Sequence, residues 1–191
     1  DIGGGTAKLA ILEKGQVKFT AAVHIGGRLQ VVDENGAIVR LDPAGRTHAL
    51  RAGFEWAIGD KVVSEDLDKV ADVMAATLID ALVIRPIPHD IEKFYLTDPI
   101  VNWGRIDGVM FSGGVAEYVY AREDRDFGDM GLRLGRAIAR RLADGDLPWP
   151  LLPAGECIRA TALGASEYSV QLSGNTCFIS DHGELLPRRN L

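Results

Sequence analysis

The stretch DIGGGT at residues 1–6, followed directly by an apolar run from Lys8, decides the fold of this chain. Three consecutive glycines in a turn between strands expose successive backbone N–H groups, and such a concave arrangement binds phosphate oxygens. A carboxylate directly before the loop would suit Mg²⁺ beside a bound phosphate. A plain glycine-rich hairpin turn explains the same string equally well. The candidate phosphate-binding residues are Gly3, Gly4, Gly5 and Thr6, and the candidate metal ligand is Asp1.

Three other glycine motifs are each weak when taken alone. The run Ser112-Gly113-Gly114 follows an apolar stretch and suits close packing of a flat base or ribose against bare backbone. The pair Gly26-Gly27 closes a predicted strand and is either a second phosphate-side turn or a bend. Gly164 lies inside a predicted helix, where glycine costs roughly 1 kcal/mol relative to Ala, so a close approach of a helix or ligand is expected.

The hydrophobic pattern predicts one α/β domain. Two hairpins come first, the second with an Asn35-Gly36 turn, because Asn-Gly supplies the positive φ that tight hairpins require. Alternating helices and strands follow, which indicates a mixed sheet covered by helices. The expected strands are 8–12, 17–23, 29–32, 37–41, 106–111 and 176–180, and the expected helices run from Ser64 to before Pro86, from Asp129 to Ala143 and from Cys157 to Leu172.

Composition excludes several classes of function. The 191 residues are 47% hydrophobic and 25% charged, which is typical of a globular protein and excludes disorder of the whole chain. A net charge of −6 without a basic run makes nucleic acid an unexpected partner. No apolar run approaches the ~20 residues that span a bilayer, so no membrane association is expected. The two cysteines and four histidines are scattered, which disfavours a zinc site and fits a cytoplasmic protein.

The order of these motifs resembles the second lobe of the actin/heat-shock-chaperone/sugar-kinase ATPase superfamily. That resemblance implies an RNase-H-like, actin-like ATPase lobe over residues 1–191, with a mixed five-stranded sheet and packed helices. It also implies that ATP or ADP binds with Mg²⁺. The string at residues 1–6 looks like the second phosphate motif, 112–115 like the adenosine motif, and the helix of Gly164 like the last helix. One nucleotide would touch the first two, so both are expected to face one cleft.

Within that superfamily, six motifs in order are similar to the ethanolamine ammonia-lyase reactivating factor (EutA) family. They are DIGGGT, IGGRL at 25–29, FSGGVAE at 111–117, FGDMG at 127–131, IRATALGAS at 158–166 and QLSGNT at 171–176, and the closing LPRRNL also matches. The family implies an ATP-dependent, chaperone-like factor that releases inactivated cobalamin from ethanolamine ammonia-lyase, its partner. It further implies a cytoplasmic location, with association to the ethanolamine-utilisation microcompartment.

Proteins of this superfamily hold ATP between two lobes. The first phosphate motif and the N-terminal lobe are expected ahead of Asp1, so the chain is expected to be the C-terminal lobe, with the N-terminal lobe of the same protein as a partner. It would then carry about half of the nucleotide site. ATP hydrolysis by this chain alone is not expected, and no residue in it is assigned a catalytic role.

Two alternative functions remain open. A sugar or acyl kinase of the same fold would need a base beside an acceptor pocket, and Asp1, the acid near the phosphate loop, already has a metal role. An actin-like filament or cell-division ATPase is the other alternative. The net charge and the lack of an amphipathic membrane tail do not favour it, but neither excludes it.

Overall fold

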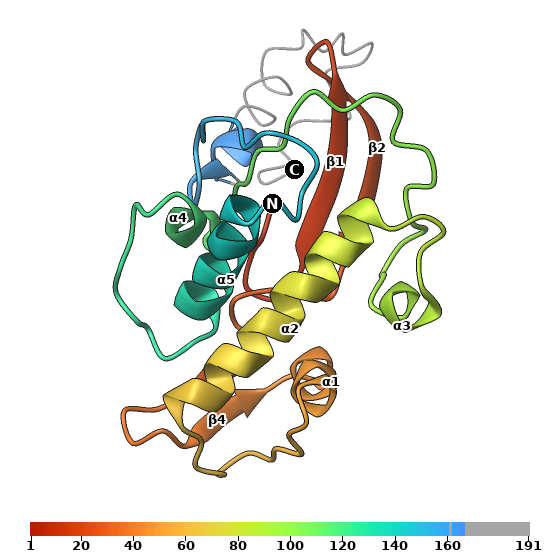
Figure 1. Cartoon of the computed structure of the whole chain (residues 1–191). Helices are drawn as coiled ribbons and strands as arrows, with labels where there is room; N and C mark the ends of the chain where they lie inside the picture. The colour runs from red at the N-terminus through yellow and green to blue at the C-terminus, as the bar shows by residue number, and fades with distance from the viewer. Residues whose placement is uncertain (161, 167–191) are drawn as a thin grey trace, which may run out of the picture. The chain divides into compact units, whose positions relative to one another are not determined.

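The computed structural model describes residues 1–160 and 162–166 of the chain (Figure 1). The chain divides into two compact units, Asp1–Arg159 and Ala160–Leu191, and each is described by itself. In the second unit, residues 160 and 162–166 are helical, which agrees with part of the helix expected over Cys157–Leu172. The rest of that helix and the strand expected at 176–180 lie outside the described residues.

The first unit opens with the predicted hairpin of β1 (Ala7–Glu13) and β2 (Gln16–Val23). The strands are antiparallel, with Ala7 opposite Val23 and a bulge between Ile11 and Leu12. The turn residues Lys14 and Gly15 both have positive φ, 53° and 77°, as a two-residue hairpin turn of matching twist requires. The two strands form the long ribbon in Figure 1.

The second predicted hairpin, β3 (Gln30–Val32) and β4 (Ile38–Leu41), is also present. Gly36 has φ +76°, and the Asp33 carboxylate accepts the N–H groups of Asn35 and Ala37 at 2.9 Å. The turn is therefore stabilised both by the glycine and by a local side-chain bond.

Two long helices begin and end close to where the sequence predicts. Helix α2 (Ser64–Val83) ends before Pro86, and α5 (Gly131–Ala143) follows Asp129, whose carboxylate accepts the Gly131 N–H at 2.8 Å. Helix α1 (Pro43–Arg51) has no counterpart in the prediction; Pro43 at its first turn suits a helix start. The short helices are α3 (His89–Glu92) and α4 (Ala116–Val119).

The mixed α/β class is confirmed, but the described residues do not form the expected five-stranded sheet. They form two separate two-stranded sheets, β1–β2 and β3–β4. The segment 106–111, predicted as a strand, is extended chain with a single parallel bridge from Val109 to Leu151. A strand needs a neighbour along its length. Among the described residues, the backbone partners here are Pro150 and Leu152, which both bond Val109, and Ile2, which donates its N–H to the Ser112 carbonyl at 2.8 Å just after the segment.

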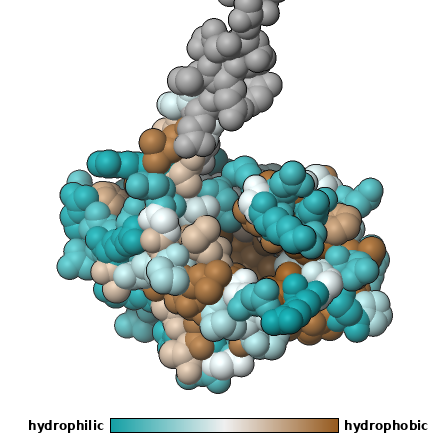
Figure 2. Space-filling view, turned by 90° about the horizontal axis from the view of Figure 1, so that it is seen from above, coloured by the Kyte–Doolittle hydropathy of each residue, from teal (hydrophilic) through white to brown (hydrophobic). Residues whose placement is uncertain are grey.

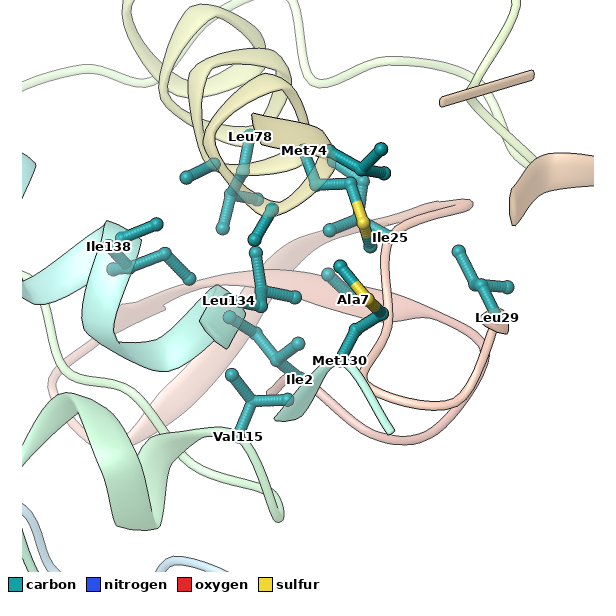
Figure 3. Close-up of a cluster of buried hydrophobic side chains, with 14 of the residues drawn as sticks. Ile2, Ala7, Ile25, Leu29, Met74, Leu78, Val115, Met130, Leu134 and Ile138 are labelled. Carbon is teal, nitrogen blue, oxygen red and sulfur yellow. The ribbon is translucent and has the colours of Figure 1, made fainter. Parts of the chain in front are cut away.

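One hydrophobic core joins the strands to the two long helices (Figure 3). Helix α2 buries the predicted apolar stripe, including Met74 and Leu78, and α5 contributes Leu134 and Ile138. Ile2 lies between Leu134 and Val115 in the same cluster. Each buried side chain of this size stabilises the fold by about 1.5–3 kcal/mol, so the glycine-rich loop that follows Ile2 is anchored to the core.

His48 in α1 is a fully buried histidine. Its Nε2 lies 2.9 Å from the His24 carbonyl oxygen, which requires a proton on Nε2, and its ring stacks on Phe94 with centroids 4.4 Å apart. Burial lowers the pKa of His48 from 6.5 to about 4. The hydrogen bond to His24 raises the pKa by less, and the positive charge of Arg51 lowers it further. The imidazole is neutral in the folded protein at pH 7.

We predict that stability falls as the pH drops from 6.5 to 4. The unfolded chain binds a proton on His48 in this range and the folded chain does not. The full contribution of neutral His48 to the free energy of unfolding is therefore present above pH 6.5 and is lost as the pH falls. The loss should reach about 3 kcal/mol. Denaturant unfolding at pH 7 and pH 4.5 measures it. His48→Gln should flatten the slope, whereas His89→Gln, on a side chain that is 95% exposed, should not.

Candidate functional site

Asp1 and Ser112, both candidate site residues, meet although they are 111 positions apart. The Ser112 hydroxyl donates to Asp1 Oδ2 at 3.0 Å, and Lys8 Nζ lies 3.3 Å from Oδ1 of the same carboxylate. The Asp1 side chain is 22% exposed. The carboxylate is therefore oriented by two partners and still reached by solvent. Lys8 was not predicted, although its place opposite Asp1 across the glycine loop is the signal that could have found it.

The three glycine motifs of the first unit pack against one another through their backbones. Gly27 and Arg28 donate their N–H groups to the carbonyls of Gly3 and Gly4, at 2.9 and 2.6 Å. On the other side, Ile2 donates to the Ser112 carbonyl at 2.8 Å and accepts the Val115 N–H at 3.2 Å. The loop 1–6 therefore lies between the segments 24–28 and 112–115.

Two of the candidate glycines, Gly26 and Gly113, are required by this packing, and a third, Gly27, is in tight contact. A Cβ on Gly26 would lie 2.4 Å from the Gly4 carbonyl oxygen, and one on Gly113 would lie 2.4 Å from that of Ile2. Gly113 also has φ +87°, a conformation that favours glycine. A Cβ on Gly27 would lie 3.1 Å from a methyl carbon of Val115. Close backbone contact explains these three residues without a ligand.

Other candidate glycines are open. A Cβ on Gly5 or Gly114 would meet no atom of the described residues within 4 Å, apart from those of its chain neighbours. Within the part of the chain that the structure describes, no hydrogen bond uses the N–H groups of Gly4, Gly5 or Thr6. Gly4 is exposed, and the other two residues are half-buried. Three successive free N–H groups in a turn can bind an anion.

Two cavities of about 500 Å³ border these open glycines. The first, which we call the α1 cavity, is lined by Gly5, Thr6, His24, Leu29, Asp42, Pro43, Ala44, Thr47, Lys93 and Phe94. The second, the Gly114 cavity, is lined by Gly114, Glu117, Tyr118, Arg122, Glu123, Arg125, Phe127, Glu156, Cys157, Ile158 and Arg159. Neither cavity contains both motifs, so the single cleft expected from the sequence stays a prediction.

The Gly114 cavity is rich in charged side chains held by local contacts. Arg122 donates to the carbonyls of Ala154 and Gly155, both at 3.1 Å. The Arg125 guanidinium hydrogen-bonds Glu123 and lowers the pKa of that carboxyl to about 2. Arg125 also lies over the Phe127 ring, 4.9 Å from its centroid. Fixed guanidinium groups and aromatic faces are suited to a flat, electron-rich ligand.

A divalent cation would have a single protein carboxylate at this loop, that of Asp1. Among the described residues there is no group of three or more His, Cys, Asp or Glu side chains that could hold a metal ion. Mg²⁺ is commonly held by one or two carboxylates together with substrate phosphates and water. The donor set at Asp1 therefore fits Mg²⁺ bound with a phosphate, but not a metal ion held by protein ligands alone.

Gly164 cannot be related to this site. It belongs to the second unit, is exposed, and a Cβ on it would meet no described atom within 4 Å. The close approach expected at this position is thus not made by the described residues, and a role in ligand binding stays a prediction.

Comparisons with known proteins relate the whole chain to one family. The family model described as ethanolamine utilisation protein EutA matches residues 1–191. The ethanolamine ammonia-lyase reactivases EutA of Salmonella typhimurium and Escherichia coli K12 are each 28% identical over 198 residues. These alignments cover 100% of the chain but 40% of each relative, so the chain spans well under half the length of these proteins. No solved structure gives a significant match.

We predict opposite effects for two glycines of this site. Gly26→Ala places a methyl group against the Gly4 carbonyl and should destabilise the fold by about 1–3 kcal/mol. Gly5→Ala meets open space and should change the free energy of unfolding by less than about 1 kcal/mol. Denaturant titration of both variants tests this. Equal losses would show that Gly5 is also a packing residue.

Proposed function

Because this chain belongs to the EutA family of ethanolamine utilisation proteins, we propose that it is the nucleotide-binding part of a reactivating factor for ethanolamine ammonia-lyase. The two relatives are named as reactivases of that lyase. The observation that carries the nucleotide part is the run of N–H groups at Gly4, Gly5 and Thr6, which bond no described residue, beside the oriented Asp1 carboxylate. In the proposed cycle, ATP binding drives release of inactivated cobalamin from the lyase.

Different residues around the loop would bind different parts of ATP or ADP. The N–H groups of Gly4, Gly5 and Thr6 would bind the phosphate oxygens. Asp1 would hold Mg²⁺, which neutralises phosphate charge when bound. Gly114, which carries no side chain, leaves room for a base in the Gly114 cavity, near Tyr118 and Arg159. Ile2 links the two regions through its bonds to Ser112 and Val115.

The hydrogen-bond pattern supports an RNase-H-like lobe as the fold of this part. Asp1 accepts the Lys8 N–H at 2.7 Å, which makes it an antiparallel neighbour of β1. Ile2 bonds Ser112 on the other side. Val109 in turn bonds the carbonyl of Pro150 at 3.0 Å and the N–H of Leu152 at 2.8 Å. We propose that β2, β1, Asp1–Ile2, 109–112 and 150–152 belong, in that order, to a single mixed sheet of the longer protein.

A strand running into Asp1 would complete this sheet. In a strand, residues two positions apart point their N–H and C=O groups to the same edge. Ala10 therefore lies on the edge of β1 where Lys8 bonds Asp1, and Met110 lies on the edge of 109–112 where Ser112 bonds Ile2. Both edges would be paired by one strand, antiparallel to β1 and parallel to 109–112. We propose that the longer protein supplies this strand, and that an N-terminal lobe closes the nucleotide site.

The hairpin of β1 and β2 offers a surface for such partners. Leu12, Val17 and Phe19 are each more than half exposed. The face of the molecule seen from above in Figure 2 also has hydrophobic surface in a hollow, with hydrophilic side chains on its rim. Contiguous apolar surface of this kind commonly marks a protein interface. The other lobe and the lyase are the proposed partners, and the family implies a cytoplasmic location at the ethanolamine-utilisation microcompartment. No helix of the described residues is long and apolar enough to cross a membrane.

The phosphotransferase alternative gains no support at the α1 cavity. A kinase needs a free base beside the acceptor, and the carboxylate that lines this cavity is Asp42. Both Asp42 oxygens accept hydrogen bonds from Arg40, at 3.0 and 2.8 Å, and this pairing lowers the pKa of the carboxyl. Asp42 is therefore a poor proton acceptor near neutral pH.

Gly114→Val in the full-length protein should weaken ATP binding at least about tenfold, because the side chain fills the space proposed for the base. The change in the free energy of unfolding should stay small, because no described atom beyond the chain neighbours lies within 4 Å of a Cβ at this position. Calorimetric titration with ATP measures the first effect. Ala143→Val, at an exposed residue at the end of α5 and outside the cavity lining, is the control. Unchanged affinity in Gly114→Val would leave Gly114 as a plain turn residue.

Asp1→Asn in the full-length protein keeps the shape of the side chain and its bond to Ser112 but removes its charge. Folding should be nearly unaffected, while Mg²⁺-dependent ATPase activity and reactivation of cobalamin-inactivated lyase should be severely reduced. Both activities are assayed with purified lyase. A variant that hydrolyses ATP and restores the lyase at the normal rate would exclude Asp1 as the metal ligand.

A further inference from the structure

The α1 cavity has a size and lining that the proposed nucleotide site does not use. It borders the phosphate loop only at Gly5 and Thr6. The rest of its wall comes from His24 and Leu29 between β2 and β3, from the start of α1 with the preceding Asp42, and from the segment after α3. Its volume of about 500 Å³ is that of a small-molecule site. The phosphates of a nucleotide bound on the loop would leave most of this space unfilled.

Ring stacking and hydrogen bonds hold the lining residues of the α1 cavity in place. The ring of His48 stacks on Phe94 and its Nε2 hydrogen-bonds the His24 carbonyl. His24 in turn donates its N–H to the Phe94 carbonyl at 2.8 Å. The Arg51 guanidinium lies 5.3 Å from the centroid of the Phe94 ring. A cavity with walls held in this way is formed before any ligand arrives, which lowers the ordering cost of binding.

The charges at the α1 cavity favour an anion. Asp42 is neutralised by the two hydrogen bonds from Arg40. Lys93 forms no ion pair with any described residue, and it is exposed. His24 adds an imidazole that can donate a hydrogen bond. Lys93 is therefore the uncompensated charge of the lining.

The remaining lining is apolar. Leu29, Pro43, Ala44 and Phe94 form most of the wall, and Thr47 adds a methyl group. An inorganic anion would leave this surface in contact with water, whereas an apolar body would cover it. We propose that the α1 cavity binds a small organic anion, a carboxylate or phosphate monoester on an apolar body, beside the phosphate loop. This proposal does not depend on nucleotide binding.

The test uses phenyl phosphate, benzoate and inorganic phosphate as probes, titrated into the full-length protein and followed by calorimetry. Phenyl phosphate or benzoate should bind, and inorganic phosphate should bind at least about tenfold more weakly. Whether phenyl phosphate or benzoate binds more tightly distinguishes a phosphate monoester from a carboxylate as the natural ligand. Equal affinity of inorganic and phenyl phosphate would overturn the proposal, because the apolar wall would then contribute nothing.

Two variants test whether the probes bind in the α1 cavity. Ala44→Leu fills the space and Lys93→Gln removes the charge, and each should weaken probe binding at least about fivefold. Ala143→Leu on the exposed end of α5 and Lys18→Gln on β2 are the matched controls. Probe binding that survives both cavity variants contradicts the proposal. Lys93 is exposed, so its variant remains informative should Ala44→Leu fail to fold.

Adenosine separates this proposal from the proposed function. It carries no phosphate and should bind the Gly114 cavity in the wild-type protein and in Ala44→Leu alike. If the wild-type protein binds the organic anion probes but not adenosine, the result contradicts the proposed nucleotide site and supports the anion site in the α1 cavity. The reverse result would contradict the α1 cavity alone.

Discussion

The structure depends on how the backbone of residues 1–6 is held between two other segments. Ile2 bonds the chain at 112–115 on one side, and Gly3 and Gly4 accept bonds from Gly27 and Arg28 on the other. The side chain of Ile2 is buried in the core at the same time. The backbones of these segments can lie this close together only because Gly26 and Gly113 have no Cβ. The glycine-rich loop is thus an anchored part of the core and not a flexible surface turn.

This arrangement resolves two interpretations of a glycine motif that the sequence leaves open. Close packing explains Gly26, Gly27 and Gly113, where a methyl group would strike backbone or a neighbouring side chain. Open space surrounds Gly5 and Gly114, where packing gives no reason to exclude a side chain. Packing therefore accounts for Gly26, Gly27 and Gly113, and ligand binding stays the prediction for Gly5 and Gly114. A sequence does not distinguish them, because a glycine that packs and a glycine that admits a ligand are the same letter.

Features decided by short-range chemistry could be predicted from the sequence. The turn at Gly36, the apolar stripe of α2 and the start of α5 after Asp129 each depend on residues within a few positions. The remaining features depend on distant residues. Among the described residues, the segment 106–111 forms one bridge, because its neighbours at 150–152 and at Ile2 are each too short to pair along its length. The α1 cavity combines side chains from five separate segments, and α1 itself was missed because its short sequence has no clear apolar period.

The anchoring of the loop also bears on how it could bind anions. A flexible turn would have to order its N–H groups when an anion arrives, and fixing the backbone of one residue costs about 1–2 kcal/mol. Here Gly3 and Gly4 are already fixed by their carbonyl bonds, while the N–H groups of Gly4, Gly5 and Thr6 stay free. The carbonyl groups of Gly3 and Gly4 thus stabilise the fold, and the N–H groups of Gly4, Gly5 and Thr6 are left for the proposed anion. Because Gly5 and Thr6 also border the α1 cavity, groups bound on the loop and in that cavity would meet the same preorganised backbone.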